Sequence, residues 1–215
     1  MSPDEPLPHA LLPGARQAFA SEDATRRFAK VARLEPGSRV LLLGDVEAAA
    51  LLLARDYDCH VVAADVDAEA LARLRTQAGA QGLAEQVETL PLEEALNGGG
   101  PSDFQAVLVR GPRVYRTREA AERLRARLGR DGRLGLIAVT RVGRAPEEAE
   151  LARWEALQGA PLLPPLGLLS ELRDTGYEPE AVEVLSPAEL VALTEEAGEE
   201  ASHEALRAWH EREGG

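Results

Sequence analysis

The chain has 215 residues, of which 45% are hydrophobic, and a formal net charge of −13. This length suits one domain with extensions, because two full domains would each have a small core. The acidic charge argues against a nucleic acid as the main partner, since nucleic-acid affinity is built largely on Lys and Arg that neutralise phosphates.

Other class signals point to a cytoplasmic protein. The N-terminus lacks a positive segment followed by an apolar one, and no run reaches the roughly 18 apolar residues of a membrane span. Cys59 is the only cysteine, so the chain has no intrachain disulfide and no cysteine-based metal site. We therefore expect no membrane contact and no bound metal.

The N-terminal part of the chain leads into a buried strand. Residues 1–20 are rich in proline and are predicted to form a mobile arm. A helix follows, with Ala24, Phe28, Val31 and Ala32 on one face. The sequence LEPG at 34–37 is typical of a turn into the strand 40–43.

The next segment, 40–90, alternates strands with helices. Apolar runs at 40–43 and 60–64 flank an Ala- and Leu-rich helix, and neither run alternates with polar residues. Such runs are typical of strands that are buried on both faces of a parallel sheet. Asp67 is a candidate N-cap for a helix through residue 80, and 86–90 is predicted to be a third strand.

The second half of the chain repeats this order. We predict strands at 106–110 and 133–139, with a helix at 117–128 and a turn at 130–132 between them. Helices are expected at 146–157 and 166–175, a strand at 181–185, and an acidic helical tail at 186–215. The alternation predicts one α/β domain at 21–185, built as three layers with helices on both faces of a mostly parallel, Rossmann-like sheet.

Polar residues follow the first two strands, at the edge where open parallel sheets hold ligands. Gly44 and Asp45 come after the first strand and Asp65 after the second. Each has a simpler interpretation too: Asp65 can stabilise the following helix N-terminus, and Asp45 can be a solvated turn residue. Glu93, near the end of the third strand, can equally be the exposed start of a helix.

Several motifs together resemble the class I S-adenosylmethionine-dependent methyltransferases, in particular the small-molecule branch. They are PGSRVLLLG at 36–44, VVAADVDAEAL at 61–71, GRDGRLGLIAV at 129–139 and TGY at 175–177. The resemblance implies S-adenosylmethionine as cofactor, with Asp65 on the ribose hydroxyls and Glu93 near the adenine. The cofactor-binding residues that we predict on this basis are Gly44, Asp45, Asp65, Val66, Glu93 and Arg110, and no catalytic residue is assigned.

The first motif departs from the pattern of that family. The family's acidic residue and three glycines fall here on Leu42, Gly44, Val46 and Ala48, so one glycine remains. Leu42 cannot accept a hydrogen bond, and Val46 is β-branched where a tight backbone is wanted. We therefore treat the fold and cofactor binding as separate predictions.

Arginines gather after the fourth and fifth strands, which are neighbours in this topology. Arg110, Arg113 and Arg116 follow the fourth strand, and Arg141 and Arg144 follow the fifth. Guanidinium groups suit carboxylate or phosphate, so we expect an anionic ligand here. The alternative is surface pairing with Glu147, Glu148 or Glu150. The predicted substrate contacts are Arg113, Tyr115, Arg141 and Trp154.

The sequence thus favours a methyltransferase that acts on a small molecule, including an anionic one. The alternative is an inactive protein of the same fold that serves as a binding or assembly module. A nucleotide-binding oxidoreductase is a third reading, because an acid at a strand end also suits the ribose of NAD. The absence of Gly-x-Gly-x-x-Gly speaks against that third reading.

Overall fold

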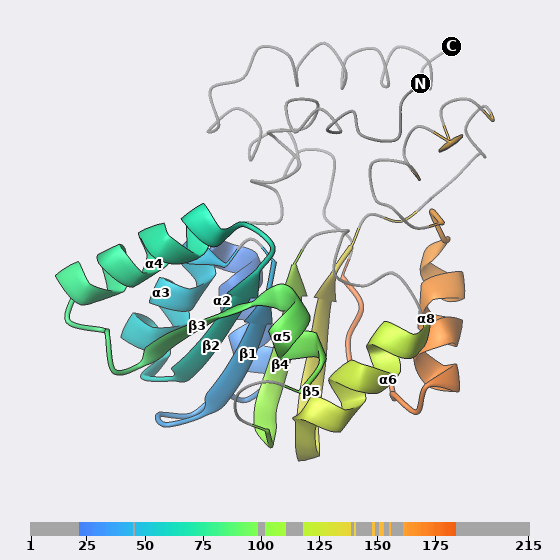
Figure 1. The fold of residues 1–215 in the computed structure, drawn as a ribbon. Coiled ribbons are helices and arrows are strands. Elements are labelled where there is room, and N and C mark those ends of the chain that lie inside the picture. The colour runs from blue at the N-terminus through green and yellow to red at the C-terminus, as the bar shows by residue number, and fades with distance from the viewer. Residues whose placement is uncertain are drawn as a thin grey trace, which may run out of the picture.

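The computed structural model describes residues 22–44, 46–98, 102–110, 118–138, 140, 148, 151–152, 155 and 161–183. Within these ranges, a five-stranded sheet lies between two layers of helices (Figure 1). Its pairings are all parallel, in the order β3-β2-β1-β4-β5. The strands are β1 (Arg39–Leu43), β2 (His60–Asp65), β3 (Val87–Pro91), β4 (Phe104–Arg110) and β5 (Leu128–Ile137).

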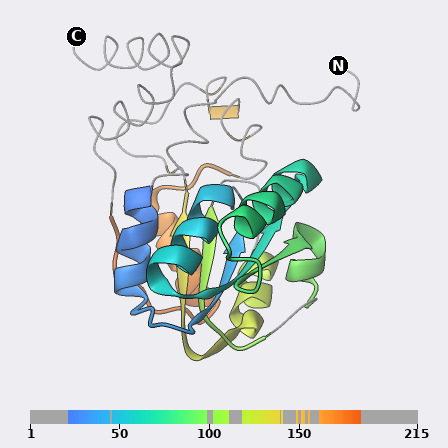
Figure 2. The same ribbon diagram turned by 90° about the vertical axis from the view of Figure 1, so that its left-hand side faces the viewer.

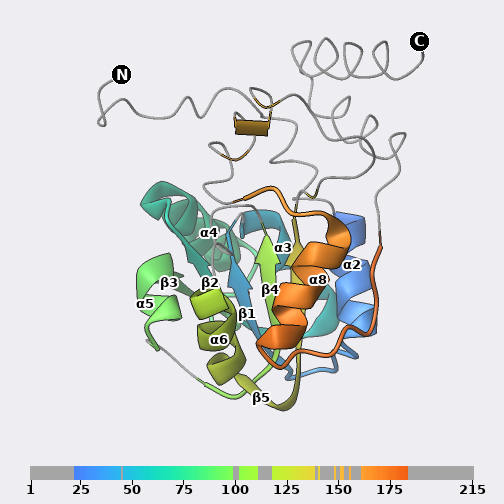
Figure 3. The ribbon, with the colours of Figure 1, turned by 90° about the vertical axis from the view of Figure 1, so that its right-hand side faces the viewer.

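Two groups of helices cover the sheet. Figure 2 shows α2, α3 and α4 in front of one face, and Figure 3 shows α5, α6 and α8 on the other side of the sheet. The helices are α2 (Glu22–Val31), α3 (Glu47–Tyr57), α4 (Ala68–Ala80), α5 (Leu92–Leu96), α6 (Arg118–Arg127) and α8 (Pro165–Asp174). The predicted three-layer α/β fold is therefore confirmed.

The core has two halves, one on each face of the sheet. In β1, Val40 and Leu42 belong to the half beneath α3, whereas Leu41 and Leu43 belong to the half beneath α5 and α6. This division follows from the strand geometry, because successive side chains point to opposite faces. It explains why the strand sequences are apolar runs without alternation.

The helix α2 packs closely on the sheet because of a glycine in β5. A Cβ added at Gly135 would overlap the ring of Phe28. The buried residues of α2 are Thr25 and Ala29, while Val31 is exposed. The predicted apolar face was thus wrong at Val31, because the helix presents its small side chains to the sheet layer and to α3.

Two predictions for the second half of the sheet were wrong. Residues 130–132 lie within β5, where the register with β4 shifts between Phe104 and Ala106, so they do not form a separate turn. Residues 181–183 are not a strand. Two ion pairs at 3.0 Å hold this part of the chain instead, one between Arg133 and Glu180 and one between Arg27 and Glu183.

The remaining elements begin and end within a few residues of the predicted positions. The arm at 1–20 and the tail at 186–215 lie outside the described residues, and the domain limits stay a prediction. Of the predicted helix 146–157, the described positions 148, 151–152 and 155 are helical. Among the described helices, none combines the length and the apolarity that crossing a membrane requires.

Candidate functional site

The carboxyl ends of β1, β2 and β4 lie side by side. Leu43 pairs with Ala64 on one side and with Val109 on the other. The next residues along these strands are Gly44, Asp65 and Arg110. Because neighbouring strands are about 4.8 Å apart, the structure brings three of the predicted cofactor-binding residues to one stretch of the sheet edge, with Gly44 in the middle.

Gly44 has a backbone conformation that favours glycine. Its φ is 72°, in the left-handed region, and its N–H donates to the carbonyl oxygen of Ala64 at 2.9 Å. A side chain here would cost backbone strain, whereas glycine adopts this φ freely. The one glycine that remains in the first motif therefore stands at a position where the backbone requires it.

Val46 has no such requirement, although the motif usually has glycine there. Its φ of −91° and ψ of −20° lie in the right-handed region, which any residue adopts. Its side chain is 1% exposed and packs in the core half beneath α3. Val46 is thus tolerated at this motif position, because its backbone is ordinary and its side chain lies in the core.

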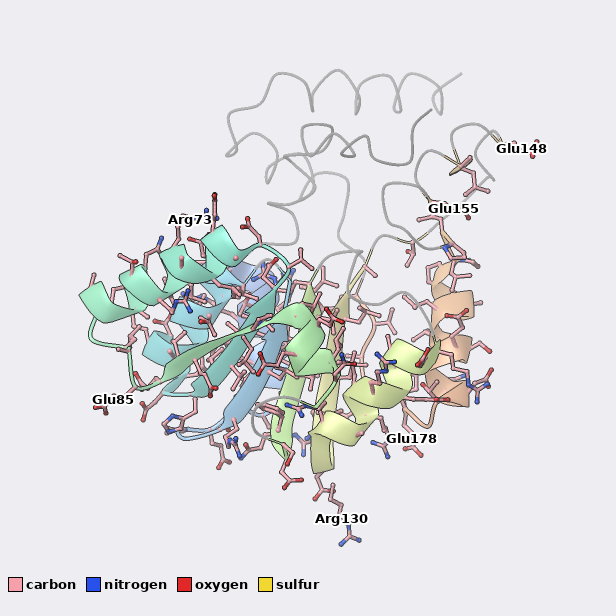
Figure 4. All side chains as sticks on the ribbon, viewed as in Figure 1. Arg73, Glu85, Arg130, Glu148, Glu155 and Glu178 are labelled. Atoms are coloured by element: carbon pink, nitrogen blue, oxygen red, sulfur yellow. The ribbon has the colours of Figure 1, made fainter. Side chains whose placement is uncertain are left out.

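Glu47, the next residue, is held by α4. The guanidinium of Arg73 donates to both of its carboxylate oxygens, at 3.1–3.3 Å, and Gln77 donates to one of them at 3.3 Å. Figure 4 shows Arg73 on α4, at the opposite side of the molecule from Arg130. The first turn of α3 is thus tied to α4 by charge-assisted hydrogen bonds.

Asp65 and Asp67 have separate local roles. One carboxylate oxygen of Asp67 accepts from the backbone N–H groups of Glu69 and Ala70, which confirms the predicted helix cap. The Oδ1 atom of Asp65 accepts from the N–H of Asp67 at 3.0 Å, and this residue is partly exposed at the sheet edge. Asp65 therefore shapes the loop into α4 and also reaches the solvent at the end of β2.

Val66 and Glu93, two further predicted cofactor-binding residues, lie beside this edge and are exposed. Val66 is 66% exposed, so its apolar side chain is accessible from solvent. Glu93 lies in the first turn of α5, two residues after Pro91, the register partner of Asp65. Glu93 is exposed, so the structure agrees with the simpler interpretation of an exposed helix start.

Arg110 is the most unusual residue of the edge. It is 1% exposed and is the largest side chain among those that are fully buried in the described part of the chain. It ends β4 and pairs in register with Ile137 of β5. Sequence reasoning placed Arg110 at the edge but missed its burial, and it did not single out Ile137, which only the strand register identifies.

Asp45, Arg113, Tyr115, Arg141 and Trp154 lie outside the described residues. Within the described residues, no group of three or more His, Cys, Asp or Glu side chains could hold a metal ion.

Two further residues with reactive side chains lie away from this edge. His60, the only histidine among the described residues, begins β2 at the opposite edge of the sheet. Cys59 is buried, and burial together with the charge of Asp58 raises the pKa of its thiol to about 11. Such a thiol is inert at neutral pH.

No model of a known protein family matches the sequence, and no curated protein matches it. Several solved structures, however, are similar to the structure of this chain. A methyltransferase from Geobacter sulfurreducens, S-adenosylmethionine-dependent and in complex with S-adenosyl-L-homocysteine, is 21% identical with a TM-score of 0.66, over 87% of this chain and 76% of that one. Phosphoethanolamine N-methyltransferase 2 from Haemonchus contortus, in complex with S-adenosyl-L-methionine, is 15% identical with a TM-score of 0.67, over 92% and 52%. The [4+2]-cyclase SpnF is 22% identical with a TM-score of 0.62, over 79% and 65%.

These comparisons show that the chain has the fold of the class I S-adenosylmethionine-dependent methyltransferases, as the sequence motifs implied. SpnF, named as a cyclase, is also similar to this chain. The activity therefore has to be argued from the residues at the sheet edge.

Proposed function

We propose that this protein is an S-adenosylmethionine-dependent methyltransferase that acts on a small anionic molecule. The observation that carries the proposal is the conformation of the first loop. Glycine is kept at position 44, where φ is positive, and is lost at position 46, where the backbone does not need it. The loop thus retains the tight turn that a cofactor site at this edge needs.

The residues at the edge fit the cofactor. Because Gly44 has no side chain, the ligand can come close to the backbone at this position. Asp65, partly exposed at the end of β2, offers carboxylate oxygen to ribose hydroxyls. The exposed side chain of Val66 provides apolar surface for the adenine ring, and Glu93 offers an acceptor nearby. In this proposal Asp45 joins them from the same loop.

S-adenosylmethionine, when bound, supplies a methyl group on a sulfonium that is already activated for transfer. The protein then contributes mainly alignment of donor and acceptor, together with exclusion of water. Arginines after β4 and β5 suit a carboxylate or phosphate on the acceptor, with Arg113 and Arg141 as the proposed contacts. Tyr115 and Trp154 are proposed to line the same pocket.

Cofactor binding is tested by isothermal titration calorimetry with S-adenosylhomocysteine on the full chain. We expect Asp65→Asn to weaken binding about tenfold, because a charge-assisted hydrogen bond becomes a neutral one. The matched control is Asp67→Asn, two residues away, since asparagine also caps helices and this carboxylate is used by α4. Equal affinities of the two variants would refute the role of Asp65.

Binding by the wild-type protein decides the cofactor itself. If S-adenosylhomocysteine gives neither a heat of binding nor thermal stabilisation, and NAD does stabilise the protein, the proposal is overturned in favour of a nucleotide-binding oxidoreductase. At a ligand concentration of about a hundred times the dissociation constant, the expected stabilisation is about 2.7 kcal/mol.

Turnover is tested by the release of S-adenosylhomocysteine with a panel of small carboxylates and phosphates as acceptors. We expect the variant Arg113→Ala/Arg141→Ala to raise KM for the acceptor while its affinity for S-adenosylhomocysteine is unchanged. Neutral and cationic analogues of the same acceptors serve as controls. Turnover that prefers those analogues would refute the anionic substrate, and cofactor binding without any turnover would refute the methyltransferase activity.

A further inference from the structure

The starts of α3 and α4 lie on either side of the proposed cofactor space. β1 ends at Leu43 and α3 begins at Glu47, whereas β2 ends at Asp65 and α4 begins at Ala68. Both helices therefore begin at the edge where open parallel sheets hold ligands. The position of one helix start relative to the other sets the room that a cofactor has between them.

The two helix starts are held in different ways. The carboxylate of Asp67 caps α4 by accepting from the backbone N–H groups of Glu69 and Ala70. The N-cap of α3 is Val46, whose side chain has no hydrogen-bond acceptor. A helix start without a side-chain cap is less stable than a capped one. The start of α3 therefore depends more on contacts with neighbouring elements.

Apolar packing holds α3 against its neighbours without fixing its exact position. Its first buried side chains are small, Ala49 and Ala50, and they share a core half with the buried residues of α4, which are Leu71, Leu74 and Ala78. Hydrophobic attraction has no preferred direction, and a methyl group interlocks little with the grooves of a neighbouring helix. Directional contacts are needed to fix α3 along α4.

Glu47 makes those directional contacts from the first turn of α3. Its two carboxylate oxygens accept from Nε and Nη2 of Arg73 at 3.1–3.3 Å, and one of them also accepts from the side-chain amide of Gln77 at 3.3 Å. Both donors belong to α4, which lies beside α3 on the same face of the sheet (Figure 2). A guanidinium that binds both oxygens of a carboxylate restricts direction as well as distance.

We infer that Arg73 and Gln77 are positioning residues, which act through Glu47 to fix the start of α3 relative to α4 and so keep the cofactor space in its binding geometry. The inference rests on the proposed function and adds residues that do not touch the cofactor. Without these contacts the start of α3 has more positions available. The apparent affinity for the cofactor then falls with the fraction of chains in the binding geometry.

The test is calorimetric titration of S-adenosylhomocysteine on the full chain. We expect Arg73→Met and Glu47→Gln each to weaken binding about 3- to 10-fold, the range that loss of one such contact implies. The double variant is expected to bind no more weakly than the weaker single variant, because both changes remove the same contact. Arg73→Lys keeps the charge without the fork, and its affinity is expected to lie between those of wild type and Arg73→Met.

The matched control is an ion pair at the other end of α3. Arg26 of α2 contacts Asp56, in the last turn of α3, at 2.8 Å. The side chains of Asp56 and Arg26 are 25% and 41% exposed, close to the 28% and 53% of Glu47 and Arg73. We expect Arg26→Met and Arg73→Met to lower Tm similarly, by at most about 4 °C. Arg26→Met is expected to keep its affinity within about twofold of wild type.

The outcomes separate the inference from the proposed function. If Arg73→Met and Glu47→Gln both bind with wild-type affinity, or if Arg26→Met loses as much affinity as they do, the inference is overturned and cofactor binding stands. A wild-type chain that does not bind S-adenosylhomocysteine overturns the proposed function itself. Glu47→Gln tests the same contact from α3, so the inference stays testable even where Arg73→Met does not fold.

Discussion

Replacing Val46 by glycine restores the second glycine of the first motif, and we expect this change to harm the protein. The side chain is fully buried, so its loss costs about 2 kcal/mol of unfolding free energy. The added backbone freedom of glycine costs about 0.5–1 kcal/mol more. Position 46 is the N-cap of α3, where glycine is better than valine by up to about 1 kcal/mol. The net destabilisation is about 2 kcal/mol, or roughly 4–8 °C in Tm.

The assay pairs urea denaturation with calorimetric titration of S-adenosylhomocysteine. Because the backbone at Val46 is already in an ordinary conformation, we expect the affinity of Val46→Gly to stay within about threefold of wild type. Ala48→Gly is the control at the third motif position, since Ala48 is exposed within α3 and should lose about 1 kcal/mol with the same affinity. A Val46→Gly protein with wild-type stability and tighter binding would refute the reasoning.

Three other predictions concern stability. Gly135→Ala should lower the unfolding free energy by about 1–3 kcal/mol, since the added Cβ would overlap the Phe28 ring. Gly79→Ala should raise the unfolding free energy by up to about 1 kcal/mol, because Gly79 lies within α4 and faces open space. Urea denaturation measures both free-energy changes, and changes of the same sign in the two variants would contradict the packing argument. Asp67→Ala should lower the unfolding free energy by about 1 kcal/mol through loss of the helix cap, and Asp67→Asn should lower it much less. Urea denaturation of the two variants checks this difference. The raised pKa of Cys59 means that the unfolded state loses this proton first, so stability should fall from about pH 9 to about pH 11. Unfolding free energies of wild type and Cys59→Ala across this range should diverge accordingly, and parallel curves would exclude the thiol as the cause.

Much of the fold follows from local sequence signals. The apolar runs at 40–43 and 60–64 predict strands that are buried on both faces, and Asp67 predicts the helix start that the structure has. These signals work because burial on two faces and helix capping depend on neighbours in sequence. The register shift between β4 and β5 could not be predicted in this way, since it depends on how two strands distant in sequence pair.

The site was harder to predict, because its residues come from separate strands. The positions of Gly44, Asp65 and Arg110 at one edge followed from the predicted topology. The sequence did not show that Val46 is tolerated, since a motif does not distinguish a glycine that supplies a positive φ from a glycine that can be replaced. Only the torsion angles and the direction of the side chain make that distinction.

The central place of β1 has a consequence for synthesis of the protein. In sequence, β2 follows β1 closely, but the other neighbour of β1, β4, comes much later, because Arg39 and its hydrogen-bond partner Gln105 are 66 positions apart. At 5–20 residues per second, the ribosome needs roughly 3 to 13 s to deliver that neighbour. During this interval the nascent chain carries an open edge of apolar β1. We expect ribosome-bound chains that end before β4 to bind chaperones, and chains that extend beyond β5 to bind them far less.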